Sequence, residues 1–183
     1  MNRQEALESV RANVENENLV KHMLATEAIM RALAKHLGED EREWGLAGLL
    51  HDIDVELTEG DMGSHSKLGA DLAREMGAGE DMVHAILCHN EAHGVSRETM
   101  LDKALFCADP ITGLITAAAL VRPDKKLAGV EVKSIKKRFK EKSFAAGAKR
   151  EQIATCNELG LELDEFITLS LEAMKSVSED LGL

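Results

Sequence analysis

The dipeptide His51-Asp52 is the feature of the sequence that most directly suggests chemistry. It follows the apolar run Leu46 to Leu50 and offers an imidazole nitrogen and a carboxylate oxygen side by side. A single His22 precedes it and Asp109 follows it, both among apolar residues with helical spacing. Two histidines and two carboxylates make a nitrogen and oxygen site suited to a divalent transition metal. The alternative, core histidines with a capping and a surface aspartate, leaves a carboxylate unpaired beside imidazoles, which is costly if it is buried.

The order of these residues resembles the HD superfamily of metal-dependent phosphohydrolases. That pattern has a histidine on one helix, an adjacent His-Asp ending a later helix, and an aspartate further on. The corresponding segments here read KHMLATEAIM, GLAGLLHDID and ALFCADPITGLI, and SHSKLGADLA and AILCHNE match two further family segments. The resemblance covers about residues 18 to 120. It looks most like a branch of uncharacterised, predicted HD hydrolases, so it implies a class of chemistry without a substrate.

The resemblance implies one or two divalent transition metals, with Mn, Fe, Ni, Co and Zn all open as identities. The implied ligands of the first metal are His22, His51, Asp52 and Asp109. Asp52 is also the candidate catalytic residue, because it could bridge two metals or orient the nucleophile. A metal at such a centre makes hydroxide available at neutral pH and polarises a phosphoryl oxygen.

Histidines in the two further family segments imply a second metal, held by His65 and His89. The alternative is that both are exposed histidines at helix ends. His89 is followed by Asn90, whereas two-metal relatives often carry paired histidines there. His84 and Cys88, one helical turn apart, could also bind metal, although core packing is the simpler interpretation.

Composition favours one all-α domain over residues 1–183, with an HD core at about 18–120 and a basic, helical C-terminal extension at about 121–183. The chain has two prolines and 3% aromatic residues, and its frequent Ala, Leu, Glu, Lys and Met favour helices. Apolar periodicity predicts helices over about 4–13, 16–36, 40–50, 80–90, 97–108, 111–120, 147–159 and 164–181, with another around Leu68 to Met76 after Ser64 as its N-cap. Pro110 should break or kink the chain between two of them.

The sequence also predicts a cytoplasmic location. Three cysteines form no spaced framework, as expected in a reducing compartment. The first residues, MNRQEALESV, contain no apolar signal core. No stretch approaches the roughly 20 apolar residues of a membrane span, so no membrane association is expected. A homo-oligomer is possible.

Positive charge is concentrated in segment 122–150, which holds 11 Lys and Arg against three acids, a net +8 in a chain of net charge −11. The overall charge argues against stable nucleic-acid binding. The segment is either a solvated helix face or a basic wall that attracts a phosphorylated substrate. Candidate substrate contacts are Lys67, Lys126, Lys133, Lys137 and Arg150.

The predicted function is metal-dependent hydrolysis of a nucleotide or other small phosphate ester by a metal-activated hydroxide. The sequence Ile53-Asp54-Val55-Glu56 lacks the Gly-Lys that follows His-Asp in some cyclic-dinucleotide phosphodiesterases, which disfavours that activity. Alternatives are a di-iron oxygenase on the same scaffold and a catalytically silent metal-binding protein.

Overall fold

The fold is all-α, as predicted: a computed structural model describes residues 1–183 and contains helices and turns but no strand. The helices are α1 (Arg3–Asn13), α2 (Glu17–Leu37), α3 (Glu41–Leu50), α4 (Lys67–Glu75), α5 (Glu80–Cys88), α6 (Met100–Leu120), α7 (Val132–Lys140), α8 (Arg150–Ala154), α9 (Leu163–Ser176) and α10 (Ser178–Leu181). Short 3-10 turns cover Glu91–His93, Leu127–Gly129 and Thr155–Leu159.

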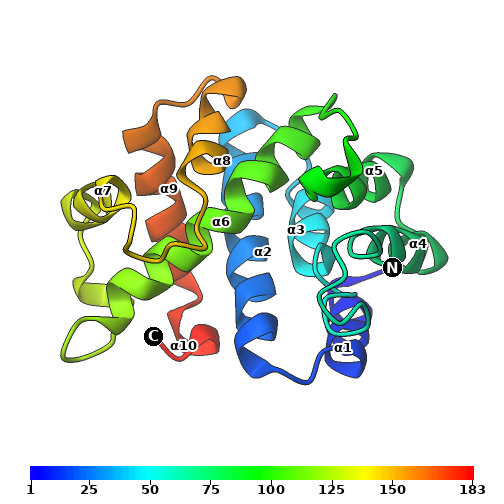
Figure 1. Cartoon of the computed structure of the whole chain (residues 1–183), viewed down its shortest axis with the longest axis horizontal. Helices are drawn as coiled ribbons and strands as arrows, with labels where there is room; N and C mark the ends of the chain where they lie inside the picture. Colours follow the sequence, from blue (N-terminus) through cyan, green and yellow to red (C-terminus); the bar gives the residue numbers. More distant parts are fainter.

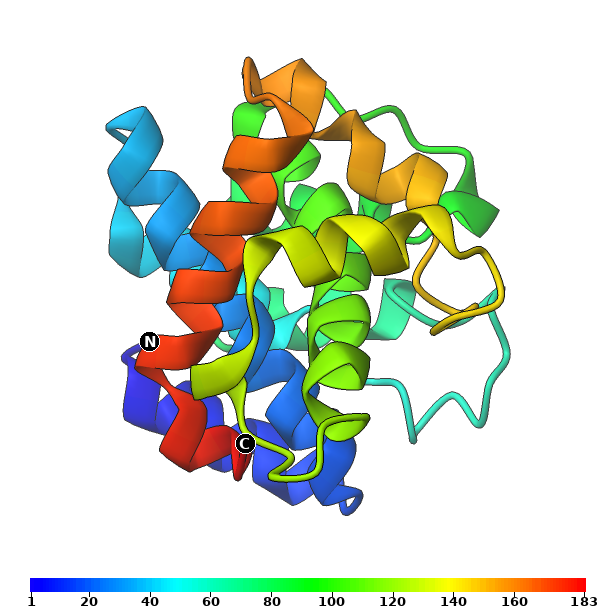
Figure 2. The same cartoon turned by 90° about the vertical axis from the view of Figure 1, so that its left-hand side faces the viewer.

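Helix α6 crosses the middle of the molecule, with α7 and α9 on one side and α4 and α5 on the other (Figure 1). It packs against α2, α5, α7, α8 and α9, and its apolar side chains join an aliphatic core that includes the fully buried Met23, Leu50 and Ile111. Helix α10 lies against α2 near the two chain ends (Figure 2). The C-terminal helices therefore complete the same core as the N-terminal ones.

Gly48 allows α2 and α3 to approach backbone to backbone. A Cβ at this position would lie 2.9 Å from the backbone of Thr26 and Glu27 on α2. Any larger residue would force the two helices apart. The close approach brings His22, on α2, next to His51, directly after α3.

Pro110 does not interrupt α6, so the prediction of two helices, about 97–108 and 111–120, was wrong. Proline lacks the N–H that would bond the carbonyl four residues earlier, here that of Phe106. The Gln152 side chain, from α8, donates to the Phe106 carbonyl instead at 2.8 Å. The carbonyl is thus satisfied, and the helix continues through Asp109 and Pro110.

Other boundaries also differ from the prediction. The helix after Ser64 begins only at Lys67, because the Ser64 hydroxyl bonds Asp61 within the preceding turn. The predicted 147–159 helix is α8 followed by a 3-10 turn, and the predicted 164–181 helix is divided into α9 and α10. By length and composition α6 could cross a membrane, contrary to expectation, yet 67% of its most apolar stretch is buried, as in the core helix of a globular fold.

Candidate metal centre

Six predicted ligands, brought together from four helices and the turns after them, form what we call the His-Asp cluster: His22, His51, Asp52, His65, His89 and Asp109. The Asp52 carboxylate lies at its middle. One oxygen, Oδ2, is 3.6 Å from Nε2 of His22 and 3.5 Å from Nε2 of His51. The other, Oδ1, is 3.4 Å from Nε2 of His65 and 3.3 Å from Nε2 of His89. Asp52 therefore separates two pairs of histidines, each facing one of its oxygens.

Asp109 completes the first half of the cluster. Its Oδ1 lies 3.2 Å from Nε2 of His22 and 3.8 Å from Nε2 of His51. The continuous path of α6 places this carboxylate opposite α2. Two imidazoles and two carboxylates thus surround one point, with His65 and His89 on the far side of Asp52.

Each imidazole is held in place through its outward-facing Nδ1. His51 donates to the carbonyl of Gly48 at 2.9 Å, and His89 donates to the carbonyl of Ile86 at 2.6 Å. A carbonyl can only accept a hydrogen bond. These two Nδ1 atoms therefore carry the ring protons.

In His22 and His65, too, the Nδ1 atom donates a hydrogen bond away from the cluster. The Thr112 hydroxyl donates to the carbonyl of Asp109 at 2.7 Å and so accepts from Nδ1 of His22 at 2.8 Å. Nδ1 of His65 donates to Oδ1 of Asp54 at 2.9 Å. A ligating imidazole commonly makes such a second contact to a carboxylate or carbonyl, which orients it toward a metal.

The geometry fits a bound cation. Where an imidazole is neutral, its ring proton lies on Nδ1 and its Nε2 atom presents a lone pair to the cluster. Nε2 of His22 lies 3.1 Å from Nε2 of His51, and both face carboxylate oxygens. Lone pairs and carboxylates at these distances repel one another unless positive charge lies between them. Imidazole and carboxylate donors suit Mn, Fe, Co, Ni or Zn.

The pKa values of the cluster residues also indicate that its carboxylates favour positive charge nearby. Although burial opposes it, the carboxylates of Asp52 and Asp54 raise the pKa of His65 to about 10. Burial likewise works against the Asp52 carboxylate, yet the surrounding imidazoles hold its pKa well below the ordinary value. For His51 burial prevails and lowers the pKa. The cluster therefore combines ionised carboxylates with at least one imidazole that stays neutral.

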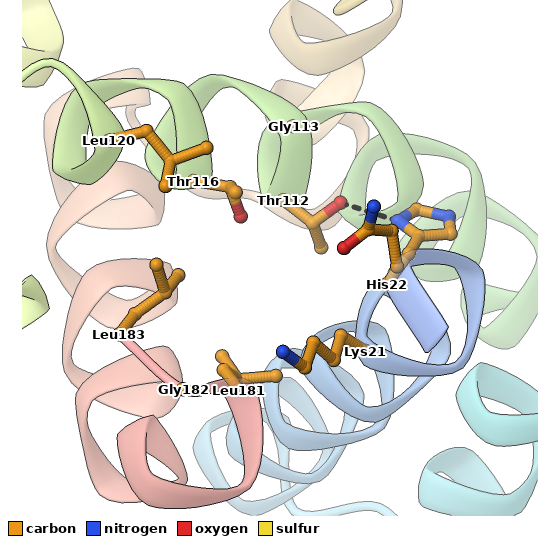
Figure 3. A pocket seen from close by; sticks show the side chains of 10 residues that line it. Lys21, His22, Thr112, Gly113, Thr116, Leu120, Leu181, Gly182 and Leu183 are labelled. Atoms are coloured by element: carbon orange, nitrogen blue, oxygen red, sulfur yellow. Dashed lines mark hydrogen bonds between the residues drawn. The ribbon is translucent and has the colours of Figure 1, made fainter. Parts of the chain in front are cut away.

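Two cavities adjoin the cluster. The Asp52 cavity, about 180 Å³, is lined by Asp52, His65, His89, Asp109 and Lys149 among others. The Lys21 cavity, about 470 Å³, lies between α2, the second half of α6 and the C-terminal residues. His22 and Thr112 form the end of the Lys21 cavity nearest the cluster, and Lys21 extends its amino group into it (Figure 3). The larger volume is in the range of small-molecule sites.

A family model described as "HD domain" matches residues 19–144. The chain belongs to the HD domain family. The sequence resemblance ended at about residue 120, whereas this match extends to residue 144 and therefore includes the basic helix α7. The cluster thus lies within an HD-type hydrolase domain.

Several proteins named Ribonuclease Y are similar to this HD domain. That of Sulfurovum sp. (strain NBC37-1) is 29% identical over 167 residues, which cover 89% of this chain and 32% of the relative. That of Aquifex aeolicus is 30% identical over 172 residues, 91% of this chain and 30% of the relative. The chain therefore spans about a third of the length of these relatives. No solved structure matches it.

The five basic residues predicted to contact substrate do not line either cavity of the HD domain. Lys67, Lys126, Lys133 and Lys137 are exposed on the surface, where Lys133 pairs with Glu131. The Arg150 guanidinium turns inward instead. It donates to backbone carbonyls of Phe139, Ala145 and Ala148, among others, so its donors are already used.

Four residues that support the cluster were not singled out as candidates from the sequence. Thr112 and Asp54 orient His22 and His65, while Lys149 and Asn90 line the Asp52 cavity. Thr112 could have been found from its position one turn after Asp109 on the same helix. Nothing in the sequence distinguishes Lys149 from the other basic residues around it.

Proposed function

We propose that this HD domain is a metal-dependent phosphohydrolase acting on a nucleotide or another small phosphate ester. The observation that carries the proposal is the position of Asp52, with one carboxylate oxygen toward His22 and His51 and the other toward His65 and His89. This arrangement offers two adjoining sites that share one carboxylate, and two metals held close together can stabilise both the attacking and the leaving oxygen of a phosphate ester.

His22, His51, Asp52 and Asp109 would hold the first metal, and Asp52, His65 and His89 the second. When bound, such metals lower the pKa of water and neutralise charge on phosphoryl oxygens. Asp52 and Asp109 both line the Asp52 cavity, and we assign to Asp52 the orientation of the attacking water. The water oxygen loses a proton and attacks phosphorus, the ester P–O bond breaks, and the leaving oxygen takes up a proton.

The surroundings of the cluster suggest how a substrate is held. The Lys21 cavity begins at His22 and Thr112 and continues past Thr116 to Leu120. Its hydroxyls and amino group suit a sugar or a second phosphate, and its leucines suit a base. Lys149, at the mouth of the Asp52 cavity, pairs with Glu91 at 3.3 Å and is the cation placed to meet an incoming phosphate.

The name of the relatives makes an RNA phosphodiester the second candidate substrate. An RNA phosphodiester would also place a phosphoester bond at the His-Asp cluster. The small phosphate ester and the RNA therefore differ mainly in how much of the substrate the protein must bind. The net charge of −11 disfavours extended contact with a nucleic acid. We therefore favour a short substrate and retain an oligoribonucleotide as the direct comparison.

The test is hydrolysis by anaerobically purified protein loaded with Mn²⁺, assayed on nucleoside monophosphates, a chromogenic phosphodiester and a short oligoribonucleotide. We expect phosphate or nucleotide release that stops when the metal is chelated. Asp52→Ala should abolish it, whereas Asp71→Ala, at an exposed aspartate paired with Arg74, should not. A protein that holds iron, consumes O₂ and leaves every ester intact would be an oxygenase instead. A protein that does neither would be a binding protein.

A further inference from the structure

A second group of possible metal ligands lies between α5 and α6. It consists of His84, Cys88 and Asp102, which we call the His84 cluster, and its ligand atoms all lie within 4.8 Å of one another. His84 and Cys88 share one face of α5, and Asp102 comes from the first turn of α6. The sequence indicated the first two residues but not Asp102, which the fold brings to them.

The Asp102 carboxylate is the observation that points to a ligand. Its side chain is fully buried. Oδ2 caps the start of α6 by accepting from the backbone N–H groups of Glu98 and Thr99, both at 2.8 Å, and also accepts from Nδ1 of His84 at 3.0 Å. Oδ1 is equally buried and has no hydrogen-bond partner. A buried carboxylate oxygen without a partner is costly.

The Cys88 thiol lies beside the Asp102 carboxylate, and burial together with that carboxylate raises the pKa of the thiol to about 12, so the thiol keeps its proton unless a metal displaces it. The Cys88 thiol is directed to the carbonyl of Ala85 in its own helix at 3.7 Å, a weak contact. The Arg97 guanidinium is stacked 3.6 Å from the centre of the Phe106 ring and makes no hydrogen bond to Oδ1. Capping of α6 uses Oδ2 alone and leaves Oδ1 free for a metal.

We propose that His84, Cys88 and Asp102 bind a zinc ion, distinct from any metal of the His-Asp cluster. Thiolate, imidazole and carboxylate are the donors that zinc takes in proteins, and thiolate and carboxylate together balance its charge. Binding would release the thiol proton to solvent and move the ring proton of His84 from Nδ1 to Nε2. The His84 side chain is 32% exposed, so water can reach the fourth coordination position.

The ion would join the end of α5 to the start of α6. Cys88 is followed directly by His89, and α6 carries Asp109 further along. Zinc at the His84 cluster would therefore fix the relative position of two helices that each supply a ligand to the His-Asp cluster. The role is structural and does not depend on what the His-Asp cluster hydrolyses.

Co²⁺ titration of the reduced protein tests the site, because only a thiolate ligand gives a sulfur-to-cobalt charge-transfer band. The His-Asp cluster contains no sulfur and cannot produce it. We expect the band in the wild-type protein, its displacement by Zn²⁺, and its loss in Cys88→Ala with one equivalent less of bound metal. Cys156→Ala, at another buried cysteine, should keep the band.

His84→Ala supplies the decisive variant should Cys88→Ala fail to fold, because this ring is partly exposed. It should weaken Co²⁺ binding at the thiolate site by at least about tenfold, since one of three protein ligands is lost. Absence of the band in the wild-type protein at saturating Co²⁺ would overturn the proposal. So would a band of unchanged strength and affinity in both variants.

Discussion

In the His-Asp cluster every imidazole has a partner on the side facing away from the centre, whereas in segment 122–150 the basic groups have no common direction. Nδ1 of His51 is held by Gly48 and that of His65 by Asp54. In the basic segment, Lys133 pairs with Glu131 at the surface while Arg150 turns inward to backbone carbonyls. Both regions are rich in ionisable groups, but only the first has the supporting contacts that make side chains converge. A segment with many charged residues is therefore weaker evidence for a functional site than a few charged side chains that hydrogen bonds orient toward one point.

Removal of the central carboxylate should give the largest effect in this comparison. Asp52→Ala takes away the only group that faces both histidine pairs, so metal content and hydrolysis should both fall, the latter at least about a thousandfold. Elemental analysis and the anaerobic assay measure the two effects. Full metal occupancy in this variant would contradict the assignment of ligands.

Removal of a supporting contact should give a smaller loss. Asp54 accepts from His65, Ser66 and Gly69, and an amide in its place would turn an N–H₂ group toward these donors. Asp54→Asn should therefore weaken metal binding at His65 and His89 by about 10- to 100-fold, measurable by metal titration. The exposed Asp124 provides the control, since Asp124→Asn should leave both metal affinities unchanged.

In the basic segment the expected effect is on folding. Arg150→Ala leaves the carbonyls of Phe139, Ala145 and Ala148 without their donor. We expect it to lower the free energy of unfolding by about 2–3 kcal/mol, as measured by denaturant titration. Lys133→Ala, on the exposed side of α7, should be indistinguishable from wild type. Equal stability of the two variants would show that the Arg150 contacts contribute nothing.

The smallest expected effect is a difference in kcat/KM between variants of Lys149 and variants of the lysines on α7. Lys149→Gln removes the cation at the mouth of the Asp52 cavity and should lower kcat/KM roughly threefold at low salt, less at high salt. The double change Lys133→Gln and Lys137→Gln should have a weaker effect, because neither residue lines a cavity. A larger loss of kcat/KM in the double variant than in Lys149→Gln would instead support the sequence-based hypothesis that the basic segment attracts a phosphorylated substrate.

The sequence was sufficient to predict the helical class and the main helices, because apolar spacing is a local pattern, and its resemblance to the HD superfamily indicated the residues that form the His-Asp cluster. It was insufficient where a distant residue decides the outcome. Pro110 predicts a break unless Gln152 is known to reach Phe106. Arg150 and Lys149 are adjacent in sequence, yet one faces backbone carbonyls and the other a cavity. Asp102 resembles any residue of a helix N-terminus until α5 is packed against it.

The contact between Gln152 and Phe106 has a consequence for how the domain can be divided. The family match ends at residue 144, before the glutamine that keeps α6 continuous at Pro110. A fragment cut at that boundary would retain every residue of the His-Asp cluster and yet lose the donor that supports the turn carrying Asp109. In a chimera or a truncation series, the smallest unit able to hold the cluster in shape should therefore extend through α8.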